Sequence, residues 1–126
     1  IGEFQGGVWE VAFGFSVRLS RELKRFRDEW RRHARTIRRI AEESFGDDLE
    51  AVYVFGSTIR GDYGVLSDID VAIVLKEDVD DETRARFRSL IRRSLGNLHP
   101  FEIHIMSRDE WEGWYLRFVG PDFVEV

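Results

Sequence analysis

The chain has 126 residues, with 24 acidic and 19 basic side chains, and 43% of its residues are hydrophobic. This length and composition are typical of one compact domain, and they exclude a disordered polymer. Because the chain has no cysteine, disulfide frameworks and zinc sites with cysteine ligands are also excluded. The apolar runs are too short for a membrane span or a signal peptide, so we expect a single domain, 1–126, in the cytoplasm.

Basic residues are concentrated in one segment. Residues 18–39 contain ten basic and three acidic side chains, a local balance of +7 in a chain whose net charge is −5. This segment is either a solvated helix face or a surface for an acidic partner or a nucleic-acid backbone. The chain has one Asn, one Gln and one Met beside its many charges, which is typical of a thermophile, although 17 of the 19 basic residues are Arg whereas the usual thermophile signal is Lys with Glu.

The first element expected from the pattern is a strand over 9–19. Apolar residues alternate there with polar or small ones, and a period of two is typical of a half-buried strand at a sheet edge. We therefore treat 1–19 as an N-terminal extension that adds an edge strand. A long helix is expected next over 21–45, with Ser20 as its N-cap, an apolar stripe on one face, and Gly46 after its end.

Three short apolar runs, rich in β-branched and aromatic residues, predict the strands of a sheet. These runs are 51–55, 69–75 and 101–106. Capping residues predict two more helices, one from Asp80 or Asp81 to Leu95, and one after the capping box of Ser107 and Glu110. The expected fold class is α/β in the α+β sense, a small mixed sheet of three to four strands with helices packed mainly on one side.

Two aspartates stand at the start of the second strand. Because positions i and i+2 of a strand share a face, Asp68 and Asp70 project together with their Cα atoms about 7 Å apart. Carboxylates this close repel each other, and a hard divalent cation such as Mg²⁺ relieves the repulsion. Glu102 joins the pair if the third strand neighbours the second in phase, and His104 shares its face, either as a packed histidine or as a site residue. Two solvated aspartates on an exposed edge are the alternative.

A glycine and a serine follow the first strand directly. Gly56 lets the chain turn sharply and approach a ligand, and the N–H groups of a short helix after it favour an anion. The hydroxyl and N–H of Ser57 would then hold nucleotide phosphates. An ordinary turn is the alternative, so the signal depends on the ten residues that separate Ser57 from Asp68.

This combination resembles a known family. Gly56-Ser57, ten residues and then Asp68-Ile69-Asp70 are similar to the motif of nucleotidyltransferases of the DNA polymerase β type, in particular the minimal nucleotidyltransferases. The Arg60-Gly61 pair and Ser67 also match residues that are common in the family. The resemblance covers 51–106, which we take as the motif-bearing core.

The resemblance implies transfer of a nucleoside monophosphate, with AMP as the expected group, from an NTP such as ATP to a protein or small-molecule acceptor. The implied catalytic and metal-binding residues, for two Mg²⁺ ions, are Asp68, Asp70 and Glu102. The implied phosphate-binding residues are Gly56, Ser57 and Arg60. Glu102 departs from the Asp often found there in minimal enzymes and could instead be a general base, and Arg60 could instead only stabilise its loop.

The resemblance also implies a partner, a helical HEPN-type toxin that such an enzyme counteracts as an antitoxin, in some cases by transferring AMP to it. A homodimer that completes the pocket is the other expected assembly. Two different functions stay open: a non-catalytic nucleotide-binding or protein-interaction module of the same fold, and a nucleotidyltransferase that acts on RNA through segment 18–39. An aromatic stripe on the last helix fits either the core or a partner groove. Its members are Trp111, Trp114, Tyr115 and Phe118.

Overall fold

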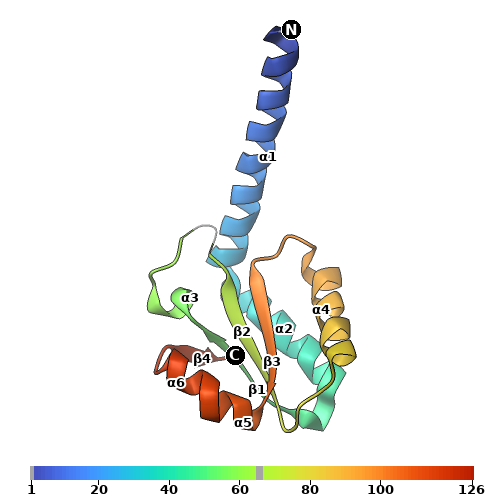
Figure 1. Cartoon of the computed structure of the whole chain (residues 1–126), viewed down its shortest axis with the longest axis vertical. Helices are drawn as coiled ribbons and strands as arrows, with labels where there is room; N and C mark the ends of the chain where they lie inside the picture. Colours follow the sequence, from blue (N-terminus) through green and yellow to red (C-terminus); the bar gives the residue numbers. More distant parts are fainter. Residues whose placement is uncertain (1, 65–66) are drawn as a thin grey trace.

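The structure, a computed structural model, describes residues 2–64 and 67–126, with side chains from Glu10 onward (Figure 1). A long helix, α1, projects from a body in which a sheet lies between helices. The longer helices and the short one in the motif are α1 (Gly2–Asp28), α2 (Trp30–Phe45), α3 (Ser57–Arg60) and α4 (Asp81–Leu95). The C-terminal helical segment consists of α5 (Arg108–Glu110), a π-helical turn η2 (Trp111–Tyr115) and α6 (Leu116–Val119). A 3₁₀ turn, η1 (Gly46–Asp48), links α2 to the sheet.

The sheet has four strands and is mixed, as predicted. Its strands are β1 (Leu49–Phe55), β2 (Ile69–Leu75), β3 (Phe101–Ser107) and β4 (Phe123–Glu125). They lie in the order β3-β2-β1-β4, with β1 antiparallel to both β2 and β4, and β2 parallel to β3. The three strands expected from the apolar runs are therefore present, each extended by no more than two residues.

The main core lies between one face of the sheet and helices α2 and α4. Because β1, β2 and β3 alternate, every second residue of each strand points into this layer. The fully buried helix residues that meet them include Ala34, Ile37 and Ala41 of α2, and Phe87 and Ile91 of α4. This packing holds the strands that carry the motif in a fixed position.

The opposite face of the sheet is covered only in part, by the C-terminal helical segment. The ring of Trp111 stacks on that of Tyr53 at 4.7 Å between centroids, and Trp111 also contacts Phe55. The predicted aromatic stripe is divided by this packing, since Trp111 is 4% exposed whereas Trp114 is 58% and Phe118 75% exposed. The uncovered part of this face carries the polar side chains of the motif strands.

The strand predicted over 9–19 is wrong, because these residues belong to helix α1. Val11, Phe13 and Phe15 are each at least 55% exposed on it. A strand needs a neighbour for its backbone groups, and the edge of the sheet beside β1 is occupied by β4. In a helix, residues i and i+2 point about 200° apart, so the alternation leaves apolar side chains on more than one side.

The helix predicted over 21–45 is present but divided, and Ser20 lies inside α1 instead of capping a helix. The division falls at Glu29, whose φ of −112° and ψ of 26° are not helical. It lets α2 lie along the sheet while α1 leaves the body (Figure 1). The last turn of α1 therefore lies at the edge of the body. Of the helices that the structure describes, none combines the length and the apolar character that a membrane span needs.

Candidate active site

Three side chains with potential metal ligands meet at one end of the sheet, on its partly covered face. The parallel register of β2 and β3 pairs Asp70 with Glu102 and Ala72 with His104, so the two strands are in phase as expected. His104 Nε2 lies 3.1 Å from Asp70 Oδ1 and 3.9 Å from Glu102 Oε1. One ligand atom from each of the three residues lies within 4.8 Å of the others.

Asp68 precedes β2 and lies outside this three-residue cluster. It is exposed, whereas Asp70 is half-buried. Asp68 is nevertheless close enough for its charge to act on Glu102. The fold thus brings Asp70 and Glu102 together, adds His104 to them, and leaves Asp68 at the solvent side of the same site.

The electrostatics of the cluster favour a cation. Burial raises the pKa of the Glu102 carboxyl above its ordinary value, and the charges of Asp70 and Asp68 raise it further, while His104 acts in the opposite direction. Carboxylates that destabilise each other's charged forms are typical of a site whose charge is completed by a metal ion. Carboxylate oxygens suit Mg²⁺, so Asp70 and Glu102 fit this ion. The imidazole of His104 is hydrogen-bonded to Asp70, so it fits the role of a residue that orients a metal-binding carboxylate.

Gly56 lies directly against the carboxylate of Asp70. It precedes α3 with a φ of +85°, and a β-carbon at this position would lie 2.5 Å from Asp70 Oδ2. Its carbonyl accepts hydrogen bonds from the N–H groups of Ile59 and Arg60, both at 3.1 Å, which starts the helical turn. Ser57 and Thr58 open this turn, so their own N–H groups have no acceptor within the helix. Only glycine allows the turn to start this close to the aspartate.

Arg60 lies at the end of the same turn and is exposed. Its Nε is 3.4 Å from Oδ2 of Asp62, a neighbouring loop residue. In this structure Arg60 therefore contacts its own loop, and its long side chain is on the surface beside the site.

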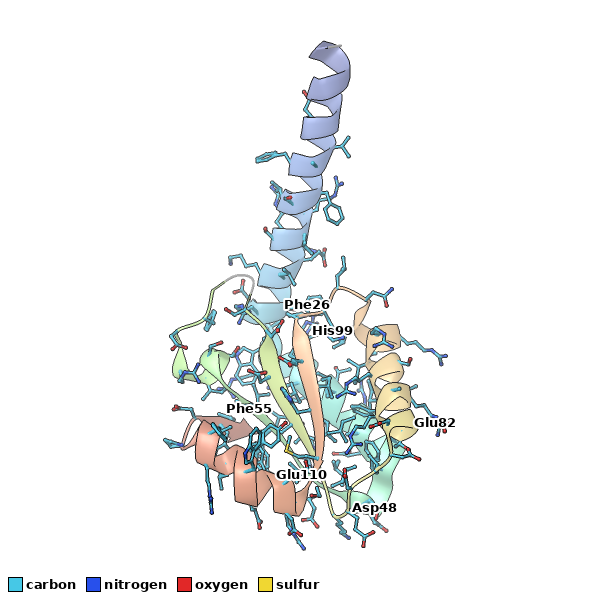
Figure 2. All side chains as sticks on the ribbon, in the orientation of Figure 1. Phe26, Asp48, Phe55, Glu82, His99 and Glu110 are labelled. Atoms are coloured by element: carbon cyan, nitrogen blue, oxygen red, sulfur yellow. The ribbon has the colours of Figure 1, made fainter. Side chains whose placement is uncertain are left out.

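His104 is the site residue to which sequence reasoning gave least weight. Its position on the Glu102 face was visible from the alternation of β3, but its contact with Asp70 depends on the pairing of two strands. The ring also packs near the aromatic rings of Phe55 and Tyr115, with centroids 5.5 and 5.9 Å away. Figure 2 labels Phe55, the last residue of β1, above the C-terminal helical segment.

We expect His104→Ala to weaken divalent-cation binding and nucleotide transfer by about 10- to 100-fold, as loss of a residue that orients a metal ligand does elsewhere. A titration with Mn²⁺, monitored by electron paramagnetic resonance, measures cation binding independently of nucleotide transfer. His104→Gln is the companion variant, because its amide can still donate a hydrogen bond toward Asp70. Equal Mn²⁺ affinity in His104→Ala and the original protein would contradict this role.

The comparisons with known proteins bear on the family and the fold of the chain. A family model described as a nucleotidyltransferase domain matches residues 34–119. Among curated proteins, spectinomycin 9-adenylyltransferase of Staphylococcus aureus is 29% identical over 82 residues, which are 60% of this chain and 32% of that protein. The chain thus spans about a third of the length of this curated relative.

Solved structures give the same result for the fold. A crystal structure provisionally named a nucleotidyltransferase is 34% identical, with a TM-score of 0.57, over 75% of this chain and 97% of that chain. Another with this provisional name, from Sulfolobus solfataricus, is 26% identical, with a TM-score of 0.58, over 82% and 85% of the two chains. A chain from the complex of an MNT antitoxin with a tri-AMPylated HEPN toxin of Shewanella oneidensis is 17% identical, with a TM-score of 0.44 over 60% and 54%. A similarity this low supports no inference about this chain.

Proposed function

Because this chain belongs to the nucleotidyltransferase domain family, we propose that it transfers AMP from ATP to an acceptor in a reaction that depends on Mg²⁺. The observation that carries the proposal is the in-phase pairing of Asp70 with Glu102, directly beside the glycine turn at Gly56. In this proposal the carboxylates hold a metal, and the neighbouring N–H groups bind phosphates. Both are needed for nucleotidyl transfer, which depends on positioning and on neutralising charge.

Each residue of the site has a role in this proposal. Asp68, Asp70 and Glu102 hold the metal, for which two Mg²⁺ ions are expected. When bound, Mg²⁺ neutralises charge on the phosphates and stabilises the attacking and leaving oxygens. The Ser57 hydroxyl and the free N–H groups at the start of α3 bind the β- and γ-phosphates. Arg60 adds a positive charge at the rim of the site, where its side chain is exposed and can turn toward the phosphates.

The reaction forms one bond and breaks one bond at the α-phosphorus. An acceptor hydroxyl oxygen attacks this phosphorus, and the bond to the β-phosphate bridging oxygen breaks, so pyrophosphate leaves. The hydroxyl proton passes to a base. Glu102 takes this role in the alternative in which it does not bind the metal, because a raised pKa makes a free carboxylate a better proton acceptor.

The acceptor in this proposal is a protein partner, and the resemblance to minimal nucleotidyltransferases makes a helical HEPN-type toxin the expected one. A surface for such a partner is available on α1, which projects from the body (Figure 1) and carries the exposed Val11, Phe13 and Phe15. Val11 and Phe15 are four positions apart and share one face of α1, and large exposed apolar side chains on one face are typical of interaction sites. A second copy of this chain, or a small-molecule acceptor, are the other outcomes of the experiment.

The test is incubation of the purified chain with Mg²⁺ and α-labelled ATP, with and without a candidate HEPN-type partner protein. Label on the partner, lost when EDTA is added, is the expected result. Label only on a small molecule would identify a different acceptor, and label on RNA would favour transfer to RNA. ATP binding without any labelled product would favour a non-catalytic binding module of the same fold.

A further inference from the structure

A buried arginine links α1 to the candidate active site. Arg27 lies in the last turn of α1 and is 5% exposed, although much of this helix is exposed to solvent. Its Nη1 donates a hydrogen bond to Thr58 Oγ1 at 3.2 Å, and its Nη2 donates one to the Ser67 carbonyl. Phe26, beside it in the chain, packs against the core at the base of α1 (Figure 2). The body therefore holds this end of the helix in place.

The two acceptors of Arg27 lie at the two ends of the motif. Thr58 follows Ser57 in the first turn of α3, and Ser67 directly precedes Asp68. The Tyr63 ring, from the loop between them, lies 4.6 Å from the guanidinium carbon. One planar side chain thus connects the phosphate-binding turn with the start of the aspartate strand. Lysine cannot reproduce this, because it lacks the fixed fork of donors.

The charge of Arg27 is also unusual. Among the residues that the structure describes, no carboxylate lies within ion-pair distance of it, and its buried Nε has no hydrogen-bond partner. A buried cation without a counter-ion is costly, and it makes a nearby anion more favourable. Arg27 contacts the first turn of α3 through Thr58, the residue that follows Ser57.

We propose that Arg27 is a positioning residue for nucleotide transfer, which holds the α3 turn and the start of β2 in register and favours nucleotide phosphates through its unpaired charge. This inference rests on the proposed function. The family match starts at residue 34, so it does not include Arg27. The side chain comes from a helix outside the motif and reaches both of its parts.

The experiment compares Arg27→Met, Arg27→Lys and the control Arg25→Met, and it adds Arg27→Ala for rescue with guanidinium. Arg25 is in the same turn of α1, but its side chain is 77% exposed and its ion pair with Glu22 is 3.7 Å long. Hydrogen exchange of amides 57–70 is measured first, in the nucleotide-free protein, and Kd for ATP with Mg²⁺ and the transfer rate are measured next. Thermal unfolding of each variant gives the folded fraction by which the rates are corrected.

We expect faster exchange over 57–70 in Arg27→Met, binding of ATP that is roughly tenfold weaker, and transfer that is about 10²-fold slower per folded molecule. Arg27→Lys should recover part of the affinity through its charge but little of the exchange protection. Arg25→Met should match the original protein in all three measurements. Added guanidinium at low concentration should restore part of the transfer activity of Arg27→Ala, because it fills the vacated position.

Unchanged exchange and unchanged ATP affinity in Arg27→Met would overturn the inference. It would also be overturned if the loss of transfer followed only the loss of folded protein and guanidinium had no effect on Arg27→Ala. If Arg27→Met does not fold, Arg27→Lys still decides the matter through the exchange of residues 57–70. Failure of the proposed function looks different, because then the original protein itself neither binds ATP nor transfers AMP.

Discussion

Replacing Asp68 and Asp70 together with Asn should abolish nucleotide transfer, with a decrease of about 10³-fold or more. Both substitutions keep the shape of the side chain and remove its charge, so the site loses two of the three carboxylates assigned to metal binding. Charge stabilisation by a metal contributes several kcal/mol to such reactions, and each 1.36 kcal/mol corresponds to a factor of ten in rate. The measurement is the initial rate of label transfer from α-labelled ATP at saturating Mg²⁺.

The unfolding temperature of the double variant shows whether a loss of transfer comes from the site or from unfolding. Asp70 lies beside Glu102, whose pKa is raised by burial and by both aspartates, so removing two of the charges relieves repulsion. We therefore expect the unfolding temperature of the double variant to be equal to or higher than that of the original protein. Asp109→Asn is the matched control, because Asp109 is exposed and lies outside the site. Transfer that persists at the original rate in the double variant would refute the assignment of these residues to the metal.

Gly56→Ala should damage the site although alanine adds only one carbon atom. This β-carbon would lie 2.5 Å from Asp70 Oδ2, a distance at which the carboxylate or the turn has to move. The φ of +85° adds a backbone cost for any residue with a side chain. We expect a loss of about 1–3 kcal/mol in the free energy of unfolding, and about 10²-fold slower transfer because reacting groups are displaced.

Gly96→Ala is the control for the cost of a positive φ at a residue with a side chain. Gly96 ends α4 with a φ of +87°, and a β-carbon there would have no atom within 4 Å. The Gly96→Ala variant should therefore have a lower free energy of unfolding but an unchanged transfer rate per folded molecule. Chemical denaturation gives the stability of both variants, and the labelled-ATP assay gives their rates. Equal transfer rates for the two variants would mean that the contact between Gly56 and Asp70 does not position the carboxylate.

Most of the motif-bearing core could be predicted from the sequence because its signals are local. The apolar runs of β1, β2 and β3 are bounded by glycine or polar residues, and these boundaries fall within two residues of those observed. The capping residues Asp80 and Ser107 accept the expected hydrogen bonds at the starts of α4 and α5. Such interactions join residues three positions apart, so they depend little on the rest of the molecule.

The N-terminal segment shows where local pattern is insufficient. An alternation of apolar residues over 9–19 fits a strand only if a sheet edge is free to receive it. In the folded protein β4 pairs with β1 at residues 53–55, and the segment continues the helix that precedes Glu29. The alternation of apolar residues does not by itself separate strand from helix, and the strand that pairs with β1 comes instead from residues about 70 positions later in the sequence.

By itself, the sequence determined β1, β2 and β3, the later helices and the residue types of the candidate site, because these follow from spacing and from local hydrogen bonds, whereas β4 was not predicted. Only the tertiary structure decided which of these residues meet. The parallel register of β2 with β3 brings His104 to Asp70, and the break at Glu29 directs Arg27 toward Thr58 and Ser67. Contacts of this kind join segments that are distant in the chain, and they exist only when the whole core has packed.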